Sequence, residues 1–277
     1  MIEETLDFVV IGAGSAGEAA TCLARGAAVA ASSVPTADSA TMAEIDRRAI
    51  EEYGITLLQM MEQAGSHLAE VARLELGGDL RDRSIVVAVG PGNNGGGGLV
   101  AARHLINRGA HVRVVLARPA LRMTEAGRHQ LATLISMGTS CCVATYDLTD
   151  EELEQALARA DLVVDAILGY NIHGAPRGEV ERLVGFIVRS QRPVVSLDVP
   201  TGTDPDTGEA SGMAITARAT LTLALPKPGL VTVAGSGRAG RVYVADIGLP
   251  AALYAQLGID VGPLFAAGRI VALDMTR

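Results

Sequence analysis

Val86-Val87-Ala88-Val89-Gly90-Pro91-Gly92-Asn93-Asn94-Gly95-Gly96-Gly97-Gly98-Leu99 is the stretch that decides the fold. It begins as an apolar run of strand type, passes through a glycine-rich turn, and continues into residues 99–105 with helical spacing. A strand, a glycine loop and a helix in this order build an anion site, because glycines let the backbone approach a ligand and free amides face negative charge. The two asparagines add amide donors and carbonyl acceptors. The stretch therefore predicts a ligand site, and the alternative is an ordinary strand-to-helix turn.

Outward from this stretch, the chain alternates short apolar strands with helices. We expect strands over 85–90, 112–117, 141–145, 162–167 and 193–198, and helices over 99–108, 124–137, 150–159 and 178–189. Short apolar strands between helices are typical of a parallel sheet covered on both faces, so the fold class is α/β. Beyond residue 217 we expect strands over 219–225, 230–233 and 241–246, and a short helix over 250–257.

Upstream of the first strand, the sequence predicts a linker and two helices. Residues 32–41 are rich in Ser, Thr, Pro and Ala, which is typical of a linker. Thr41 and Glu44 fit the spacing of a capping box, so a helix is expected from there to Tyr53. Residues 57–76 carry apolar side chains on one helical face and are expected to form the second helix.

The N-terminal segment carries a separate glycine pattern. Gly12, Gly14 and Gly17 form GxGxxG after an apolar run, and this resembles the FAD-binding start of disulfide reductases. That fingerprint requires a second strand ending in an acidic residue, whereas Ser32-Ser33-Val34-Pro35 follows here. We therefore interpret residues 1–34 as an N-terminal extension, a truncated βα unit, before a main domain over 35–277. An FAD-linked oxidoreductase is disfavoured.

Composition narrows the class of protein. The chain has 277 residues, 49% of them hydrophobic, and no apolar run approaches the ~20 residues of a membrane helix. A net charge of −8 and 3% aromatic residues argue against a nucleic-acid partner. The three cysteines show no CxxC spacing and the five histidines are scattered, which argues against a transition-metal site. Glu3 and Glu4 do not fit a secretory signal, so we expect a cytoplasmic protein.

Three segments are expected to meet where parallel strands end. They are the loop 90–98, residues 165–171 with Gly174 and Arg177 beyond, and residues 198–204. Asp165 and Asp198 would lie near one pocket, where a carboxylate can coordinate a cation, hold a ribose hydroxyl or transfer a proton. Taken singly, the alternative for each is a cap on a following helix or turn. Lys227, between two prolines, is expected either to meet a ligand phosphate or to be a solvated turn charge.

Six pieces of sequence, in order, resemble the YjeF N-terminal domain family, the NAD(P)H-hydrate epimerases. They are residues 42–46, 61–65, 90–96, 165–169, 198–202 and 227–230, reading MAEID, MEQAG, GPGNNGG, DAILG, DVPTG and KPGL. The resemblance implies a three-layer α/β/α, Rossmann-like sandwich with a mostly parallel central sheet. Members of the family are often homodimers, and a homodimer is expected here.

The resemblance also implies an activity. The family's substrate is the hydrated cofactor NADHX or NADPHX, whose R and S forms the epimerase interconverts so that a separate ATP- or ADP-dependent dehydratase repairs the S form. Carried onto this chain, a potassium ion (K+) is expected near Asn94, Asp165 and Thr201. Asp198 would be the catalytic acid and base. The implied substrate-binding residues are Asn93, Asn94, Gly95, Gly96, Gly97, Gly169, Tyr170, Asn171, Gly174, Ala175 and Asp198.

Two positions depart from the family pattern. Gly97 stands where the family usually has Asp, which removes a carboxylate at the start of the helix. Tyr170 is bulkier than the small residues common at its position, and it could reshape the pocket. The alternative function is therefore a non-catalytic nucleotide-binding or protein-interaction domain of the same family.

Overall fold

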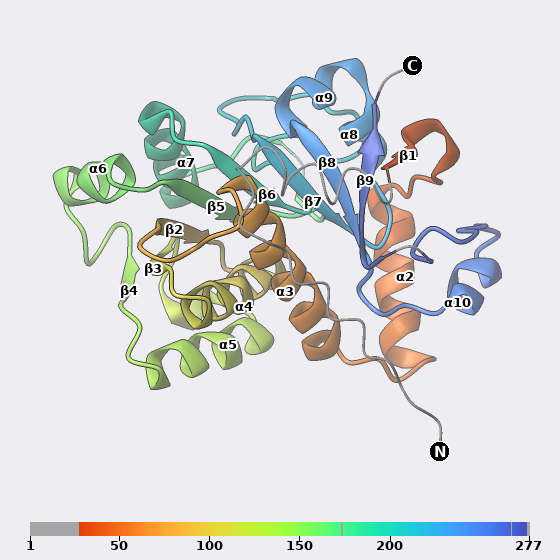
Figure 1. The fold of residues 1–277 in the computed structure, drawn as a ribbon, viewed down its shortest axis with the longest axis horizontal. Coiled ribbons are helices and arrows are strands. Elements are labelled where there is room, and N and C mark those ends of the chain that lie inside the picture. The colour runs from red at the N-terminus through yellow and green to blue at the C-terminus, as the bar shows by residue number, and fades with distance from the viewer. Residues whose placement is uncertain (1–27, 173, 267, 276–277) are drawn as a thin grey trace.

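The expected strands assemble into a mostly parallel sheet, shown in Figure 1. The computed structural model describes residues 28–172, 174–266 and 268–275. The strands within these ranges are β1 (Ala28–Ala30), β2 (Ser84–Val89), β3 (His111–Leu116), β4 (Cys141–Val143), β5 (Leu162–Ala166), β6 (Val194–Leu197), β7 (Ala219–Leu223), β8 (Arg241–Ala245) and β9 (Ile270–Asp274). Their order is β1-β9-β8-β7-β6-β5-β2-β3-β4, and of the paired neighbours only β8 and β9 are antiparallel among the described residues.

Helices cover both faces of the sheet, which confirms the three-layer α/β/α architecture. The helices are α2 (Ser39–Glu51), α3 (Leu57–Glu75), α4 (Asn93–Asn107), α5 (Glu125–Ser136), α6 (Asp150–Ala158), α7 (Glu179–Ser190), α8 (Pro228–Val231), α9 (Val233–Ala239) and α10 (Ala251–Gln256). Buried side chains of α2–α5 form one core against the sheet, and those of α6 and α7 form the core of the other face. No helix in the described ranges is long and apolar enough to cross a membrane.

The order of the strands reverses between β2 and β5. From β2 the chain moves outward through β3 to β4, and it then returns to the other side of β2 with β5 and continues through β6. In open α/β sheets, ligands bind beyond the carboxyl ends of the strands at such a reversal. Residues that directly follow β2, β5 and β6 therefore have the favoured position for a site.

The glycine-rich stretch is helical, contrary to the prediction of a loop up to residue 98. Helix α4 begins at Asn93 with Gly92 as its N-cap, and Gly95–Gly98 are buried within its first two turns. A Cβ atom on Gly98 would lie 2.4 Å from Ala166 Cβ, and one on Gly95 would lie 2.0 Å from the Gly90 carbonyl oxygen. The glycines thus let α4 pack closely on the sheet, which outweighs their low helix propensity.

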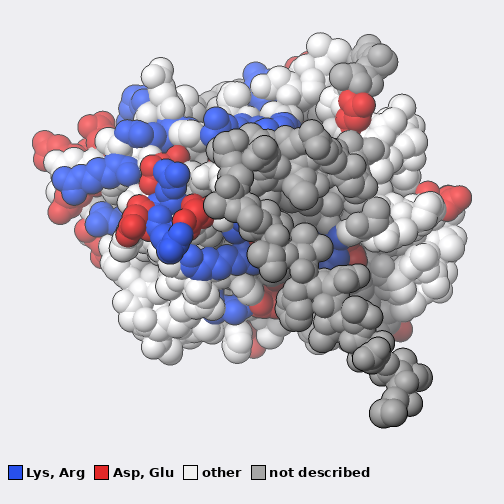
Figure 2. All heavy atoms as spheres, in the orientation of Figure 1, with Lys and Arg blue, Asp and Glu red and all other residues white. Residues whose placement is uncertain are grey.

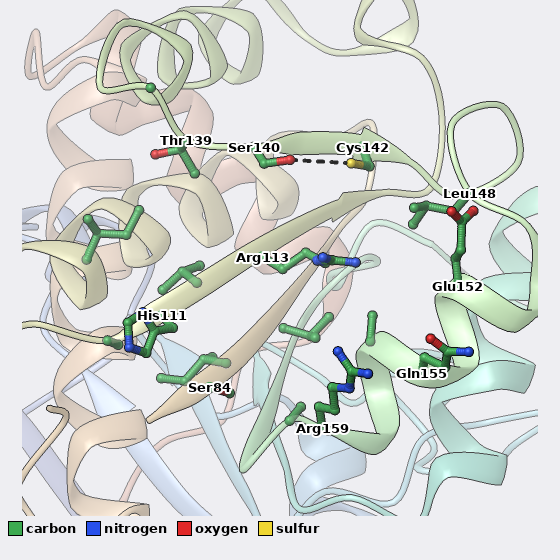
Figure 3. Close-up of a pocket in the computed structure, with 18 of the residues that line it drawn as sticks. Ser84, His111, Arg113, Thr139, Ser140, Cys142, Leu148, Glu152, Gln155 and Arg159 are labelled. Atoms are coloured by element: carbon green, nitrogen blue, oxygen red, sulfur yellow. Dashed lines mark hydrogen bonds between the residues drawn. The ribbon is translucent and has the colours of Figure 1, made fainter. Parts of the chain in front are cut away.

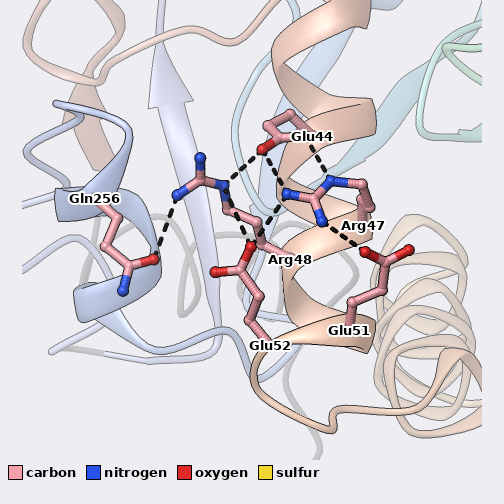
Figure 4. A network of polar contacts seen from close by, with 6 residues as sticks. All are labelled: Glu44, Arg47, Arg48, Glu51, Glu52 and Gln256. Carbon is pink, nitrogen blue, oxygen red and sulfur yellow. Dashed lines mark hydrogen bonds and ion pairs between the residues drawn. The ribbon is translucent and has the colours of Figure 1, made fainter.

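Helix α2 begins earlier than the predicted capping box. Asp38 is its N-cap, and the Asp38 side chain accepts a hydrogen bond of 2.8 Å from the Thr41 backbone N–H. Glu44, expected to close the box, instead pairs with Arg47 at 2.8 Å and Arg48 at 2.6 Å on the helix surface, as Figure 4 shows. These arginine hydrogen bonds lower the pKa of Glu44 to about 2.

The C-terminal part departs most from prediction. Residues 230–233, expected as a strand, lie instead in the short helices α8 and α9, with Thr232 between the two helices as the N-cap of α9. Strand β9 was not predicted; it lies antiparallel to β8 and parallel to β1. Residues from Ala28 thereby join the main sheet, while the boundary at residue 34 stays a prediction. The glycine pattern of Gly12, Gly14 and Gly17 lies outside the described residues.

Candidate active site

A cavity of about 370 Å³ opens at the carboxyl ends of β2, β5 and β6. It lies at the reversal of strand order, where the fold favours a ligand. Its volume is at the lower end of ligand pockets, which span about 300–1,000 Å³. Of the predicted substrate-binding residues, those that line it are Asn93, Asn94, Gly97, Gly169, Tyr170, Asn171 and Asp198.

Asp198 follows β6 directly and is held at both carboxylate oxygens. Its Oδ1 lies 2.5 Å from Lys227 Nζ, and its Oδ2 accepts a hydrogen bond of 2.8 Å from the Tyr170 backbone N–H. The contact with Lys227 is an ion pair rather than an aligned hydrogen bond, since Oδ1 has no hydrogen-bond partner among the described residues. Asp198 has a φ of 70°, a left-handed conformation that Asp tolerates better than most residues. The backbone therefore aims a fixed negative charge at the cavity.

Lys227 is buried, so the prediction of a solvated turn charge is wrong. Its side chain is 0% exposed, and its ammonium donates to the Leu223 carbonyl at 3.0 Å and to Thr222 Oγ1 at 3.3 Å. It also lies 5.4 Å from the centre of the Tyr170 ring. Burying an ammonium is costly unless it is paired, and Asp198 supplies the pair. The tight KPGL turn after β7 is the sequence signal that pointed to this residue.

Asp46 completes the polar wall, and sequence reasoning assigned it no role. It lies on α2, lines the cavity, and accepts a hydrogen bond of 2.6 Å from the Tyr170 hydroxyl through Oδ2. Burial raises the pKa of Asp46, although the hydrogen bond from Tyr170 and the charge of Lys227 oppose this shift. Burial and the nearby Asp46 carboxylate also raise the pKa of the Tyr170 phenol. The available signal was the position of Asp46 at the end of the MAEID piece.

The predicted metal ligands are only partly brought together. Asp165 is fully buried, and its carboxylate accepts from Thr201 Oγ1 at 2.7 Å and from the Thr201 backbone N–H at 2.9 Å. Asn94 lies on the cavity wall instead, where its Nδ2 donates to the Leu197 carbonyl at 3.3 Å. No group of three or more His, Cys, Asp or Glu suited to a metal occurs in the part of the chain that the structure describes.

The donor set nevertheless fits an alkali cation. The oxygens of Asp165, Thr201 and Asn94 are hard ligands of the kind that such cations prefer. The hydrogen bonds that Asp165 receives from described residues all come from neutral groups, namely Thr201, Ser196 Oγ and the Ile167 backbone N–H. A buried carboxylate with only neutral partners favours either protonation or a bound cation, and burial raises the pKa of Asp165.

The remaining predicted substrate-binding residues lie away from the cavity wall. Gly95 and Gly96 are buried inside α4, where a Cβ atom on Gly96 would lie 2.5 Å from the Met61 sulfur. Gly174 is exposed with a φ of 85°, and Ala175 is partly buried beside Gly212. Neither Gly174 nor Ala175 lines the cavity among the described residues. Their substrate contacts stay predictions.

A larger cavity, of about 820 Å³, lies elsewhere and contains none of the predicted site residues. Figure 3 shows it between the amino-terminal part of β3 and helix α6, with Arg113, Glu152, Gln155 and Arg159 around it. Its walls include Ser84 and His111, the first residues of β2 and β3. It is thus at the opposite strand ends from the favoured position, and the smaller cavity is the candidate active site.

The chain is similar to known proteins over most of its length. The family described as YjeF-related protein N-terminus matches residues 57–229. A bifunctional NAD(P)H-hydrate repair enzyme Nnr of Moorella thermoacetica is 41% identical over 218 residues, which are 78% of this chain and 41% of that protein. An NAD(P)H-hydrate epimerase of Dehalogenimonas lykanthroporepellens is 37% identical over 256 residues, which are 92% of this chain and 97% of that protein.

A solved structure shows the same fold. The crystal structure of yeast ynu0, YNL200c, matches with a TM-score of 0.75 and 27% identity, over 87% of this chain and 100% of that chain. This chain spans about two fifths of the bifunctional relative and nearly all of the Dehalogenimonas relative. The resemblance found in the sequence is confirmed, and the chain belongs to the YjeF-related protein N-terminus family.

Proposed function

We propose that the protein is an NAD(P)H-hydrate epimerase, an isomerase that interconverts the R and S forms of NADHX or NADPHX. The observation that carries the proposal is the fixed Asp198 carboxylate in the wall of a cavity at the reversal of strand order. The names of relatives that match nearly full length support the substrate class. The volume suits the hydrated ring and its ribose, with the pyrophosphate at Asn93 and Asn94 on the amino end of α4.

The chemistry follows from the substrate. The reacting carbon, C6, carries a hydroxyl group and is bonded to the ring nitrogen. When the hydroxyl is protonated, the C6–O bond breaks, water leaves, and the nitrogen lone pair forms an iminium cation. Water then adds to the other face of the ring and loses a proton. The charge of Asp198 suits it to stabilise the cation and to accept the proton of the incoming water.

Potassium belongs to the proposal as a bound ion. Asp165, Thr201 and Asn94 would hold it, given their oxygen donors. Bound there, the ion would neutralise the Asp165 carboxylate and tie together the end of β5 and the segments that follow β2 and β6. The homodimer, the cytoplasmic location and the absence of a nucleic-acid partner also stay predictions. In Figure 2, acidic side chains lie among the basic ones on the face shown. The bifunctional relatives support a separate dehydratase as the partner in the pathway.

Epimer exchange tests the proposal. We would isolate the R form of NADHX, add the protein, and follow the S form by chromatography against the spontaneous rate. We expect the native chain to accelerate exchange. The exchange rate of Asp198→Asn should be at least about 100-fold lower, a usual value for general acid–base catalysis. An Asp198→Asn protein that is folded and fully active would rule out the role of Asp198.

The non-catalytic alternative rests on Gly97, which supplies no carboxylate to the cavity wall. A Cβ atom there would meet only the end of the Leu197 side chain, at 2.7 Å, so Gly97→Asp is sterically feasible. If only Gly97→Asp accelerates exchange, the native protein binds without turnover. If neither protein does, the epimerase function is wrong.

A further inference from the structure

Tyr170 joins two carboxyl groups in the wall of the cavity. Its backbone N–H donates to Asp198 Oδ2 at 2.8 Å, and its phenol hydroxyl donates to Asp46 Oδ2 at 2.6 Å. Asp198 reaches the cavity from the end of β6 and Asp46 from α2, so the carboxyl groups come from different layers of the fold. The function proposed above uses only Asp198.

Asp46 is arranged as a carboxylic acid with a free oxygen. Its Oδ2 accepts from Tyr170, whereas its Oδ1 has no hydrogen-bond partner among the described residues. The titratable and charged groups that face it are Tyr170, Asp198, Lys227 and Tyr254. Burial is the largest influence and raises the pKa of Asp46, which favours the protonated form. When Asp46 is protonated, Oδ1 is the oxygen free to hold the proton, since Oδ2 already accepts from Tyr170.

Epimerisation itself calls for a second such group. The oxygen leaves from one face of the ring and returns to the other, and each event moves a proton on its own face. Asp198 is held at both oxygens, by Lys227 and by the Tyr170 backbone, so it cannot swing from one face to the other. A single fixed carboxyl group serves one face. When two titratable groups in one site have different environments, they can divide the acid and base roles.

We propose that Asp46 is a second proton-transfer residue, acting on the ring face that Asp198 does not serve, and that Tyr170 positions it. The proposal rests on the epimerase function. In one direction, Asp46 Oδ1 gives its proton to the C6 hydroxyl, the C6–O bond breaks, water leaves and the iminium forms. Water then attacks C6 from the other face, its proton passes to Asp198, and the iminium electrons return to nitrogen. In the reverse direction the two carboxyl groups exchange roles.

Oxygen exchange separates this proposal from a structural role of Asp46. We would incubate each NADHX epimer with the protein in oxygen-labelled water, and measure inversion by chromatography and label in the hydroxyl by mass spectrometry. We expect Asp46→Asn to slow inversion about 100-fold or more. The Asp46→Asn variant should still incorporate labelled oxygen into the hydroxyl of one epimer, because Asp198 and Lys227 still expel and return water on their own face of the ring. Asp198→Asn should retain labelling of the other epimer.

A matched control lies at the C-cap of the same helix. Glu52 belongs to the surface network with Arg47 in Figure 4, and Glu52→Gln should leave both rates unchanged within about twofold, because exposed pairs contribute little. The proposal is overturned if Asp46→Asn inverts at the native rate, or if it loses inversion and labelling of both epimers in equal proportion. A native protein that neither inverts nor labels would contradict the epimerase function itself, and this proposal with it.

Tyr170→Phe is the second variant, and it leaves the backbone contact with Asp198 intact. The hydroxyl of Tyr170 lowers the pKa of Asp46, so its removal raises that pKa. Because the acid form of Asp46 is active, the alkaline limb of the inversion rate should move to higher pH while the acidic limb stays in place. A lower rate with an unmoved alkaline limb would show a merely structural role and overturn the assignment.

Discussion

The ammonium of Lys227 lies 2.5 Å from Asp198 Oδ1, and both side chains are almost completely buried. Removing one member of such a pair leaves the other as an uncompensated buried charge, which costs more than the pair contributes. We therefore expect Lys227→Met to lower the free energy of unfolding by about 3–5 kcal/mol, measured by urea denaturation.

The double variant Lys227→Met with Asp198→Asn provides the control for this pair. The double variant retains neither charge. Its loss of unfolding free energy should therefore be clearly smaller than the sum of the losses of the two single variants. Additive losses would show that the two side chains do not interact energetically. Both single variants should be assayed for folding before their activity is interpreted.

The pairing of Lys227 with Asp198 also marks the limit of what the sequence can predict. Buried strands flanked by glycines and caps predicted the parallel sheet, and its strand ends placed Asn94, Gly169 and Asp198 in one region. Lys227 comes from a turn far along the chain, and nothing local distinguishes a buried lysine from a solvated one. Its buried environment is created by tertiary packing, which secondary-structure propensity and hydrophobic periodicity do not describe.

Local patterns failed for similar reasons at two other places. Four consecutive glycines predict a loop, yet close packing against Ala166 and Met61 makes them helical in α4. The apolar residues 230–233 predict a strand, but Pro228 begins the short helix α8, and Thr232 then caps α9. Hydrogen bonds between side chains far apart in the sequence, such as that from the Tyr170 hydroxyl to Asp46, are likewise not encoded by residue spacing.

The buried glycines of α4 should differ sharply in their tolerance of a methyl group. At Gly97 the added Cβ meets only the flexible end of Leu197, whereas at Gly98 it lies 2.4 Å from the Cβ of Ala166 on β5. We expect Gly97→Ala to change stability by less than about 1 kcal/mol, since Ala favours the helix. Gly98→Ala should cost about 1–3 kcal/mol through overpacking.

Urea denaturation of both alanine variants checks this difference, with Gly237→Ala as a matched control. Gly237 also lies in a helix, and a Cβ there meets nothing within 4 Å. Equal stabilities for the Gly97 and Gly98 variants would contradict the close approach of α4 to β5.

The N-cap of α2 gives a pH-dependent prediction. Replacing Asp38 with Ala should cost about 0.5–2 kcal/mol at neutral pH, because the Thr41 N–H loses its acceptor. The hydrogen bonds with Thr41 lower the pKa of Asp38 from 3.8. The contribution of the cap is thus present above that value and disappears as pH falls through the lowered pKa. Thermal melts of the native protein and Asp38→Ala, from neutral pH down through the lowered pKa, check this prediction, with Thr41→Ala as the control. A loss of stability in Asp38→Ala that does not depend on pH would contradict the role of the carboxylate.

A potassium ion at Asp165 and Thr201 should stabilise the native protein by mass action. At equal ionic strength, we expect KCl to give a higher Tm than LiCl by about 2–4 °C, which corresponds to about 1 kcal/mol for a domain of this size. Thr201→Val removes the hydroxyl that lies 2.7 Å from Asp165 Oδ1, and it should abolish the difference between the salts. If the native protein melts at the same temperature in both salts, this site does not bind potassium.

Asp46 should make stability fall as pH rises, independently of any activity. Its pKa is raised above 3.8 because burial penalises the carboxylate. A group with a raised folded-state pKa contributes fully below its unfolded pKa, and that contribution disappears as pH rises through the folded pKa. Asp46→Asn still accepts the Tyr170 hydroxyl but does not ionise. We therefore expect the stability of Asp46→Asn relative to the native protein to increase as pH rises above 3.8, measured by urea denaturation. A constant difference over this range would show that Asp46 ionises as freely as in the unfolded chain, and would remove the reason for a proton on its free oxygen.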